Sequence, residues 1–271
     1  MDSKKSLPLH YSATFSYGLA PNARSPLSEQ QKQTQAMTVA KALEPKRVVG
    51  HGKVRVGRNH DGGYIHVDDF AKVDAALSFG IADDASWDLD MAQRNIRIQQ
   101  FDYSIDKSPV DHPLITFHKI CIAEKDGPGA LSLDTIAGQY LVDTQRAILK
   151  IDIEGHEWPV FLATKLETLE KFAQIVCEFH GFNLLHDENA YRYMIAALRK
   201  LREVFEVVHV HGNNALPFAV IGNVVLPCLL EVTFANRRYY EFEETNEVFP
   251  TPLDQPNLPN RPDMRLGCFK F

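Results

Sequence analysis

Six ionisable side chains follow three consecutive segments that have the apolar character of buried strands. They occur as pairs spaced by two residues: Asp152 and Glu154, Glu178 and His180, and His209 and His211. Because side chains alternate along a strand, the two members of each pair point to the same face. The carboxyl ends of parallel strands meet at one edge of a sheet, so we expect the six groups to converge there.

A cluster of this composition can bind a metal, bind a substrate or pair internally. Carboxylate oxygens together with a neutral imidazole nitrogen suit Mg²⁺ or Mn²⁺. Removing so many ionisable groups from water is costly, and pairing among themselves and with Lys150 and Arg192 would also offset that cost. The clustering favours a functional site, and whether that site uses a metal stays open at this point.

A second group of residues favours an adenosine-containing cofactor. The first predicted strand ends in a turn of small residues around Gly80, which lets a ligand approach the backbone. Asp102 follows about 20 residues later at the end of the next strand, where a carboxylate can accept hydrogen bonds from ribose hydroxyls. Asp83 and Asp84 would repel a pyrophosphate at the same turn. The pattern therefore favours cationic S-adenosylmethionine over NAD.

These positions require a sheet of parallel strands connected by helices. Strands are predicted at 75–80, 96–103, 114–122, 147–154, 173–180 and 206–212, and helices at 83–95, 156–172 and 189–205. Alternation of strands and helices is typical of an α/β fold with a doubly wound, mostly parallel sheet. Two further strands near 217–226 and 228–235 lie too close for a crossover helix. We therefore predict an antiparallel hairpin at the sheet edge.

The chain divides into three parts in this interpretation. Residues 1–45 form an N-terminal arm and a helix that starts at Ser25-Pro26. Residues 46–240 form the α/β domain, which includes a hairpin at 53–67. Residues 241–271 form a proline-rich tail, which is either solvated or strapped over the domain.

Composition argues against several classes of function and location. The chain has 29 Lys and Arg against 35 Asp and Glu, a formal net charge of −6, which argues against a nucleic-acid binder. The most apolar stretch, 215–234, contains Gly222, Asn223, Glu231 and two prolines, so we expect no membrane span. The four cysteines form no CxxC pair, which indicates a reducing compartment and a cytoplasmic location.

Several motifs together resemble the FkbM-type S-adenosylmethionine-dependent methyltransferases. The most specific is ILKIDIEGHEW at 148–158, which follows LSLDTIAG at 131–138. HDGGY at 60–64, SFGIADDASWDLDMA at 78–92 and IAEKDG at 122–127 resemble the subgroup of that family with a DGGY hairpin. The resemblance implies a class I methyltransferase, Rossmann-like fold with S-adenosylmethionine as the methyl donor.

The resemblance also implies a set of cofactor-binding residues. That set is Ser78, Gly80, Asp84, Ser86, Asp102, Tyr103, Glu124 and Asp152. The turn from Gly80 to Ser86 would receive the methionine part, and Asp102 would receive the ribose. Glu124 would lie near the adenine, and Asp152 near the methionine amine or a metal.

The expected reaction is O-methylation of a sugar, glycan or related small molecule. Because such a hydroxyl is a weak nucleophile, it needs a base or a metal. We expect Asp152, Glu178 and His211 to bind a metal or orient the hydroxyl, and His180, Glu154 or Asp152 to act in catalysis, with His180 as the first candidate for the base. A metal-dependent hydrolase and a non-catalytic S-adenosylmethionine-binding module are the competing interpretations. The N-terminal helix and the tail would complete the acceptor pocket or form a homo-oligomer interface.

Overall fold

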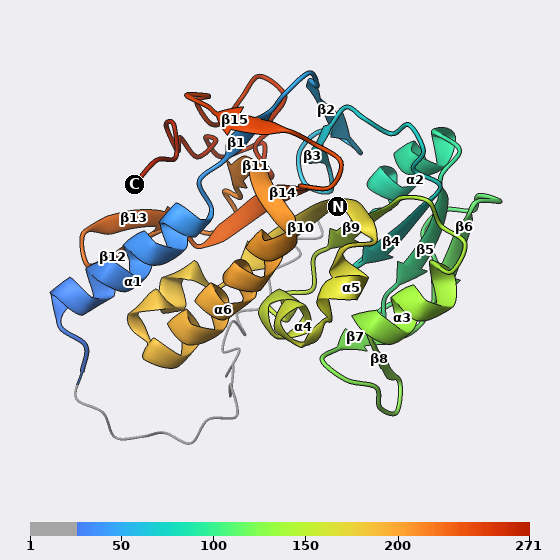
Figure 1. Ribbon diagram of the computed structural model, residues 1–271, viewed down its shortest axis with the longest axis horizontal. Coiled ribbons are helices and arrows are strands. Elements are labelled where there is room, and N and C mark those ends of the chain that lie inside the picture. Colours follow the sequence, from blue (N-terminus) through green and yellow to red (C-terminus); the bar gives the residue numbers. More distant parts are fainter. Residues whose placement is uncertain (1–25) are drawn as a thin grey trace, which may run out of the picture.

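The computed structural model describes residues 26–271 and has a central seven-stranded sheet with the order β6–β5–β4–β9–β10–β14–β11 (Figure 1). The strands are β4 (Ala75–Phe79), β5 (Arg97–Phe101), β6 (Ile115–His118), β9 (Ala147–Ile151), β10 (Phe172–His180), β11 (Phe205–Gly212) and β14 (Leu229–Asn236). Neighbouring strands from β6 to β10 are parallel, whereas β14 is antiparallel to both β10 and β11. This topology confirms the predicted class I methyltransferase fold, with an antiparallel pair at one end of the sheet.

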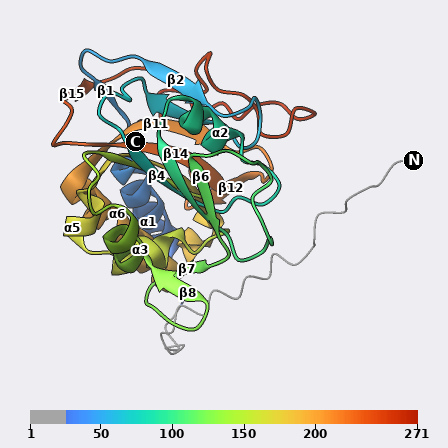
Figure 2. The ribbon, with the colours of Figure 1, turned by 90° about the vertical axis from the view of Figure 1, so that its right-hand side faces the viewer.

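Helices cover both faces of this sheet, and this explains why its central strands are so apolar. The helices are α1 (Glu29–Ala42), α2 (Ser86–Gln93), α3 (Leu133–Tyr140), α4 (Glu157–Ala163), α5 (Leu166–Leu169), η1 (Phe182–His186) and α6 (Glu188–Val204). Figure 2 shows α1, α3, α5 and α6 on one side of the sheet and α2 with β2 on the other. As a result β4, β9, β10 and β14 are buried at every residue. Among residues 26–271, no helix is long and apolar enough to cross a membrane.

Two helices differ from their predicted boundaries for local reasons. Helix α1 begins at Glu29, because Ser28 and Gln31 form a reciprocal capping box, and Pro26 precedes the helix. Ser25, the predicted cap, lies outside the described residues. The helix predicted at 156–172 is divided into α4 and α5, because the backbone is extended between them and the Lys165 N–H donates to Asp134 of α3.

The two late strands also differ from their predicted arrangement. Residues 218–227 fold on themselves as β12 (Phe218–Ile221) and β13 (Val224–Pro227), an antiparallel pair outside the central sheet. Strand β14 does not form the sheet edge, because it inserts between β10 and β11. The β12–β13 turn packs closely on α1, since a Cβ on Gly222 would lie 2.2 Å from the backbone nitrogen of Gln33.

Three further two-stranded sheets surround the core. They are β1 (Lys46–Val48) with β15 (Phe242–Glu244), β2 (Lys53–Val56) with β3 (Tyr64–Val67), and β7 (Cys121–Ala123) with β8 (Ala130–Ser132). The β2–β3 pair confirms the predicted hairpin around the DGGY sequence. Its strand β3 contacts β10, β11 and β14, so the hairpin lies over that side of the sheet.

The proline-rich C-terminal segment packs on the domain as a strap, which we define as residues 249–264. Phe249 and Met264 are buried at its two ends. Between them Asp254 lies 2.8 Å from Nε2 of His209, and Asn257 donates to Glu231 of β14. The strap is therefore attached to the sheet through polar groups, and the alternative of a solvated tail is excluded for this segment.

His211 forms a further attachment between the sheet and the strap. Its Nδ1 lies 3.0 Å from Glu231 and its Nε2 lies 2.9 Å from Asp263 of the strap. Burial opposes a charge on this ring, but the carboxylates of Glu231, Asp263 and Asp254 raise its pKa to about 10. His211 is therefore an imidazolium at neutral pH. Its ring lies between the carboxylate of Glu231 on β14 and that of Asp263 on the strap, and so it joins the two.

Replacing His211 by glutamine is expected to lower the free energy of unfolding by about 3 kcal/mol, because the buried Glu231 and the half-buried Asp263 lose their cation. The pKa of His211 is higher in the folded chain than in the unfolded chain. Its contribution to the free energy of unfolding is therefore fully present below about pH 6.5 and is lost as the pH rises through about 10. Urea unfolding at pH values from 6 to 10 measures this pH dependence of the free energy of unfolding. The difference between wild type and His211→Gln should shrink with rising pH, whereas His51→Gln, at an exposed position, should change little. A difference that grows with pH would contradict this assignment.

Candidate active site

The carboxyl ends of β4 and β9 approach each other so closely that only glycine fits between them. Gly80 follows β4 with a positive φ of 75°, and a Cβ at this position would lie 1.6 Å from the carbonyl oxygen of Asp152. Lys150 of β9 donates from Nζ to the carbonyl oxygen of Gly80 at 2.7 Å, which holds the turn in place. The turn that was expected to receive a cofactor is therefore fixed against the neighbouring strand.

A cavity of about 420 Å³ opens beside this turn. Its lining includes Gly80, Asp102, Tyr103, Asp152 and Glu154. The first four belong to the cofactor-binding set predicted from the sequence, and they come from the ends of β4, β5 and β9. Phe101, Ile120 and Ile122 add an apolar wall on the side of β7. A cavity at the switch point of an α/β sheet is where this fold binds a nucleotide-like ligand.

Asp102 organises the floor of the cavity. Its Oδ2 accepts from the backbone N–H groups of Ile81 and Ala82, at 2.8 and 2.9 Å, and its Oδ1 accepts from both the N–H and the hydroxyl of Ser104. Burial alone would raise the pKa of Asp102, but these hydrogen bonds outweigh it and lower the pKa overall. Asp102 is therefore a carboxylate, able to accept hydrogen bonds from a pair of hydroxyls that displaces the Ser104 side chain.

Four residues of the predicted cofactor set lie elsewhere. Ser78 is fully buried on β4, beside Asp88 of α2. Asp84 accepts hydrogen bonds from the N–H and the hydroxyl of Ser86, and it pairs with Arg58 of the DGGY hairpin at 3.1 Å. These two predicted cofactor-binding residues therefore contact each other and the hairpin. Glu124 is exposed and outside the lining of the cavity.

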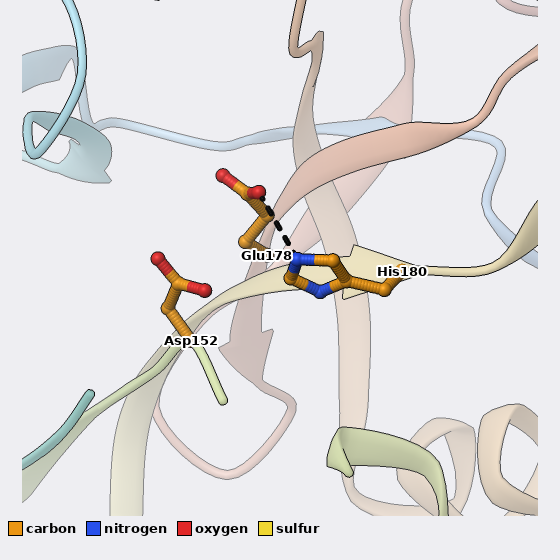
Figure 3. A group of neighbouring side chains, drawn as sticks. All are labelled: Asp152, Glu178 and His180. Carbon is orange, nitrogen blue, oxygen red and sulfur yellow. Dashed lines mark ion pairs between the residues drawn. The ribbon is translucent and has the colours of Figure 1, made fainter. Parts of the chain in front are cut away.

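The acid and histidine cluster is partly assembled, as Figure 3 shows. Asp152, Glu178 and His180 each offer one ligand atom, and these atoms all lie within 4.8 Å of one another. The Nε2 atom of His180 is 3.5 Å from Glu178 and 3.5 Å from Glu154. His209 and His211 are outside this group, because β14 separates β11 from β10 and the strap pairs with Nε2 of each ring.

The charges of the cluster perturb one another strongly. Burial raises the pKa of Asp152 to about 6, although Lys150 and His180 oppose the rise. Burial and the neighbouring Asp152 raise the pKa of Glu178 well above its usual range. Burial would lower the pKa of His180, but Glu154, Glu157 and Glu178 reverse this effect and raise it. Such opposed shifts at the mouth of a cavity are typical of functional sites.

Two residues that the sequence interpretation left out support this cluster, together with Lys150, which it named as a pairing partner. Tyr64 of the DGGY hairpin donates its hydroxyl to Oδ2 of Asp152 at 3.2 Å. Glu157, at the start of α4, lies 3.2 Å from Nδ1 of His180 and accepts the N–H groups of Ile153 and Gly155. Lys150 lies two residues before Asp152, at the same period that paired Asp152 with Glu154. That spacing was a usable signal, whereas the contacts of Tyr64 and Glu157 depend on the tertiary fold.

The match to a protein-family model agrees with this geometry. Residues 94–205 match the family model described as the methyltransferase FkbM domain, which confirms the predicted family. No curated protein matches the chain significantly. The chain is similar to a chain in the crystal structure of the fibrillarin/Nop5p complex, with 10% identity over 61% of this chain and 73% of that one and a TM-score of 0.36. It is also similar to spermidine synthase from Thermotoga maritima, with 12% identity over 78% and 81% of the two chains and a TM-score of 0.34.

Proposed function

Because this chain carries a methyltransferase FkbM domain and is an S-adenosylmethionine-dependent methyltransferase, we propose that it methylates a hydroxyl oxygen of a sugar, glycan or related small molecule. One observation carries the proposal. The cofactor cavity and the cluster of Asp152, Glu178 and His180 meet at Asp152, at the ends of adjacent parallel strands. A methyl donor in the cavity would thus lie beside groups that can orient and deprotonate an alcohol.

The residues around the cavity suit the parts of S-adenosylmethionine. The ribose hydroxyls donate to Asp102 in place of Ser104, and the apolar wall at Ile120 and Ile122 contacts the adenine. The positively charged sulfonium or amine of the methionine part lies near the carboxylate of Asp152. The tight turn at Gly80 lines the cavity on the side that the methionine part occupies.

Methyl transfer itself is an in-line displacement. The acceptor oxygen forms a bond to the methyl carbon while the bond from carbon to sulfur breaks, and the sulfur keeps the electron pair as S-adenosylhomocysteine becomes neutral. The acceptor proton must leave at the same time. We assign this proton to Glu154, whose side chain is exposed and lies 3.5 Å from His180. His180 is paired with three carboxylates, so it orients Glu154 and does not accept the proton itself.

Asp152, Glu178 and His180 also fit a divalent cation, and we propose that they bind one. Two carboxylates and one imidazole that loses its Nε2 proton on binding are a suitable donor set for Mg²⁺ or Mn²⁺. Glu157 pairs with Nδ1 of His180, as a carboxylate commonly does for a metal-binding histidine. This contact orients the ring so that Nε2 faces Glu178. A cation bound here would polarise the acceptor hydroxyl and lower its pKa.

Chelation is expected to lower methyl transfer, and Mg²⁺ or Mn²⁺ should restore it. Calorimetric titration with Mn²⁺ alone should show saturable binding that weakens at least tenfold in Glu178→Gln, because the variant loses a charged ligand. Glu167→Gln, on the exposed side of α5, is the matched control and should bind as wild type does. Absent Mn²⁺ binding together with chelator-resistant activity would make the cluster a purely protein acid–base site.

The function is tested with labelled S-adenosylmethionine and a panel of sugars and glycosides. The expected result is saturable cofactor binding by calorimetry and formation of S-adenosylhomocysteine that depends on the acceptor. A chain that does not bind the cofactor would favour the metal-dependent hydrolase, whereas binding without turnover on any acceptor would favour a non-catalytic module. The four free cysteines agree with the proposed cytoplasmic location.

A further inference from the structure

A second cavity, of about 450 Å³, adjoins the cluster on the side away from the cofactor turn. Glu154 lines both this cavity and the cofactor cavity, and His180 lines the second one. The two cavities therefore meet at Glu154, the residue to which we assign the acceptor proton. A molecule in the second cavity would reach the methyl donor through this shared boundary.

The second cavity is polar at one end and apolar along most of its length. Its polar groups are Glu154, His180 and Asn183. Its remaining walls come from η1, from β12 with the residues just before it, and from the start of β14. Their side chains include Leu184, Leu216, Phe218, Ala219 and Leu229. A molecule with hydroxyls over its whole surface would leave many of them without partners against these walls.

The walls are held by backbone contacts, so the cavity is part of the folded structure. Gly181 adopts a φ of 89° and turns the chain from β10 into η1. The N–H of Phe182 donates to the carbonyl of Cys228, and the N–H of Cys228 donates to the carbonyl of Pro217. The close contact of Gly222 with Gln33 fixes the far end of the hairpin on α1.

We propose that this cavity is the acceptor site and that it selects a hydroxyl compound with an apolar body, such as an alkyl or aryl glycoside. The hydroxyl end lies at Glu154 and His180, and the alkyl chain or aromatic ring lies between η1 and the β12–β13 hairpin. The identity of the hydroxyl end rests on the proposed methyl transfer. The preference for an apolar body rests on the lining of the cavity alone.

The test compares octyl β-glucoside with methyl β-glucoside, two probes that share the sugar and differ in the apolar group. Calorimetry with S-adenosylhomocysteine present, below the micelle concentration, should show at least tenfold tighter binding of the octyl compound. Ala219→Trp fills the cavity and should remove this preference. Val220→Trp is the matched control, because the next residue of the strand points to the opposite face and is 70% exposed, so the preference should persist.

Several outcomes would overturn the proposal. Equal binding of the two glucosides, no binding of either, or an unchanged preference in Ala219→Trp would each do so. Circular dichroism and binding of S-adenosylhomocysteine show whether the variants are folded. The proposed function fails separately, when no S-adenosylhomocysteine is formed from the cofactor, because the binding preference is measured without turnover.

Discussion

Replacing Asp152 by asparagine is expected to lower kcat/KM for methyl transfer by at least about 10²-fold while the chain remains folded. Asp152 lines the cofactor cavity and belongs to the cluster of ligand atoms, so one substitution removes the negative charge from both places. Asparagine has the same shape, and its amide oxygen can still accept the hydroxyl of Tyr64. The loss should therefore arise from charge and not from packing.

Steady-state kinetics with varied cofactor and acceptor measures the effect. Asp143→Asn, at an exposed position after α3, is the control for removal of one negative charge and should retain full activity. Binding of S-adenosylmethionine by calorimetry separates a cofactor defect from a defect in the transfer step. Activity of Asp152→Asn within about threefold of wild type would exclude Asp152 from the reaction.

Replacing Gly80 by alanine is expected to destabilise the chain by about 3 kcal/mol or more and to abolish cofactor binding. The added Cβ would meet the carbonyl oxygen of Asp152 at 1.6 Å, and the φ of 75° is unfavourable for any residue with a Cβ. Because the contact is between backbones of β4 and β9, a side-chain rotation cannot relieve it. The strands must separate, and the floor of the cavity separates with them.

Gly138→Ala provides a control with the same chemical change. Gly138 lies on the exposed side of α3, and a Cβ there would point into open space, so alanine should stabilise the helix by up to about 1 kcal/mol. Urea unfolding of both variants, with calorimetry of S-adenosylmethionine binding, measures the two effects. Wild-type cofactor binding in Gly80→Ala would show that the turn does not contact the cofactor.

Much of the fold follows from local patterns in the sequence. The strands β4, β5, β9, β10 and β11 were predictable because parallel strands buried on both faces require continuous apolar runs. Helix α6 was predictable from its helical spacing of apolar residues. The break between α4 and α5 was not, because it depends on a hydrogen bond from Lys165 to a residue of another helix.

The sequence by itself determined which residues stand at the strand ends. Period-two spacing identified Asp152 with Glu154 and Glu178 with His180, and the turn and strand-end signals identified Gly80 and Asp102. These positions follow from the alternation of side chains along each strand, which is a local property. Their proximity depends on the strand order, because β9 is the parallel neighbour of both β4 and β10 in the folded chain.

Only the tertiary structure decided which of these groups act together. Strand β14 inserts between β10 and β11, so His209 and His211 lie a further strand away, about 10 Å from β10 by the usual spacing of strands. The strap then pairs with both rings, and His180 completes the cluster in place of His211. Tertiary contacts also place two predicted cofactor residues outside the cavity. Ser78 is buried in the core, and Asp84 pairs with Arg58. Strand order and long-range pairing depend on contacts between distant residues, and the period of a single strand carries no information about its neighbours.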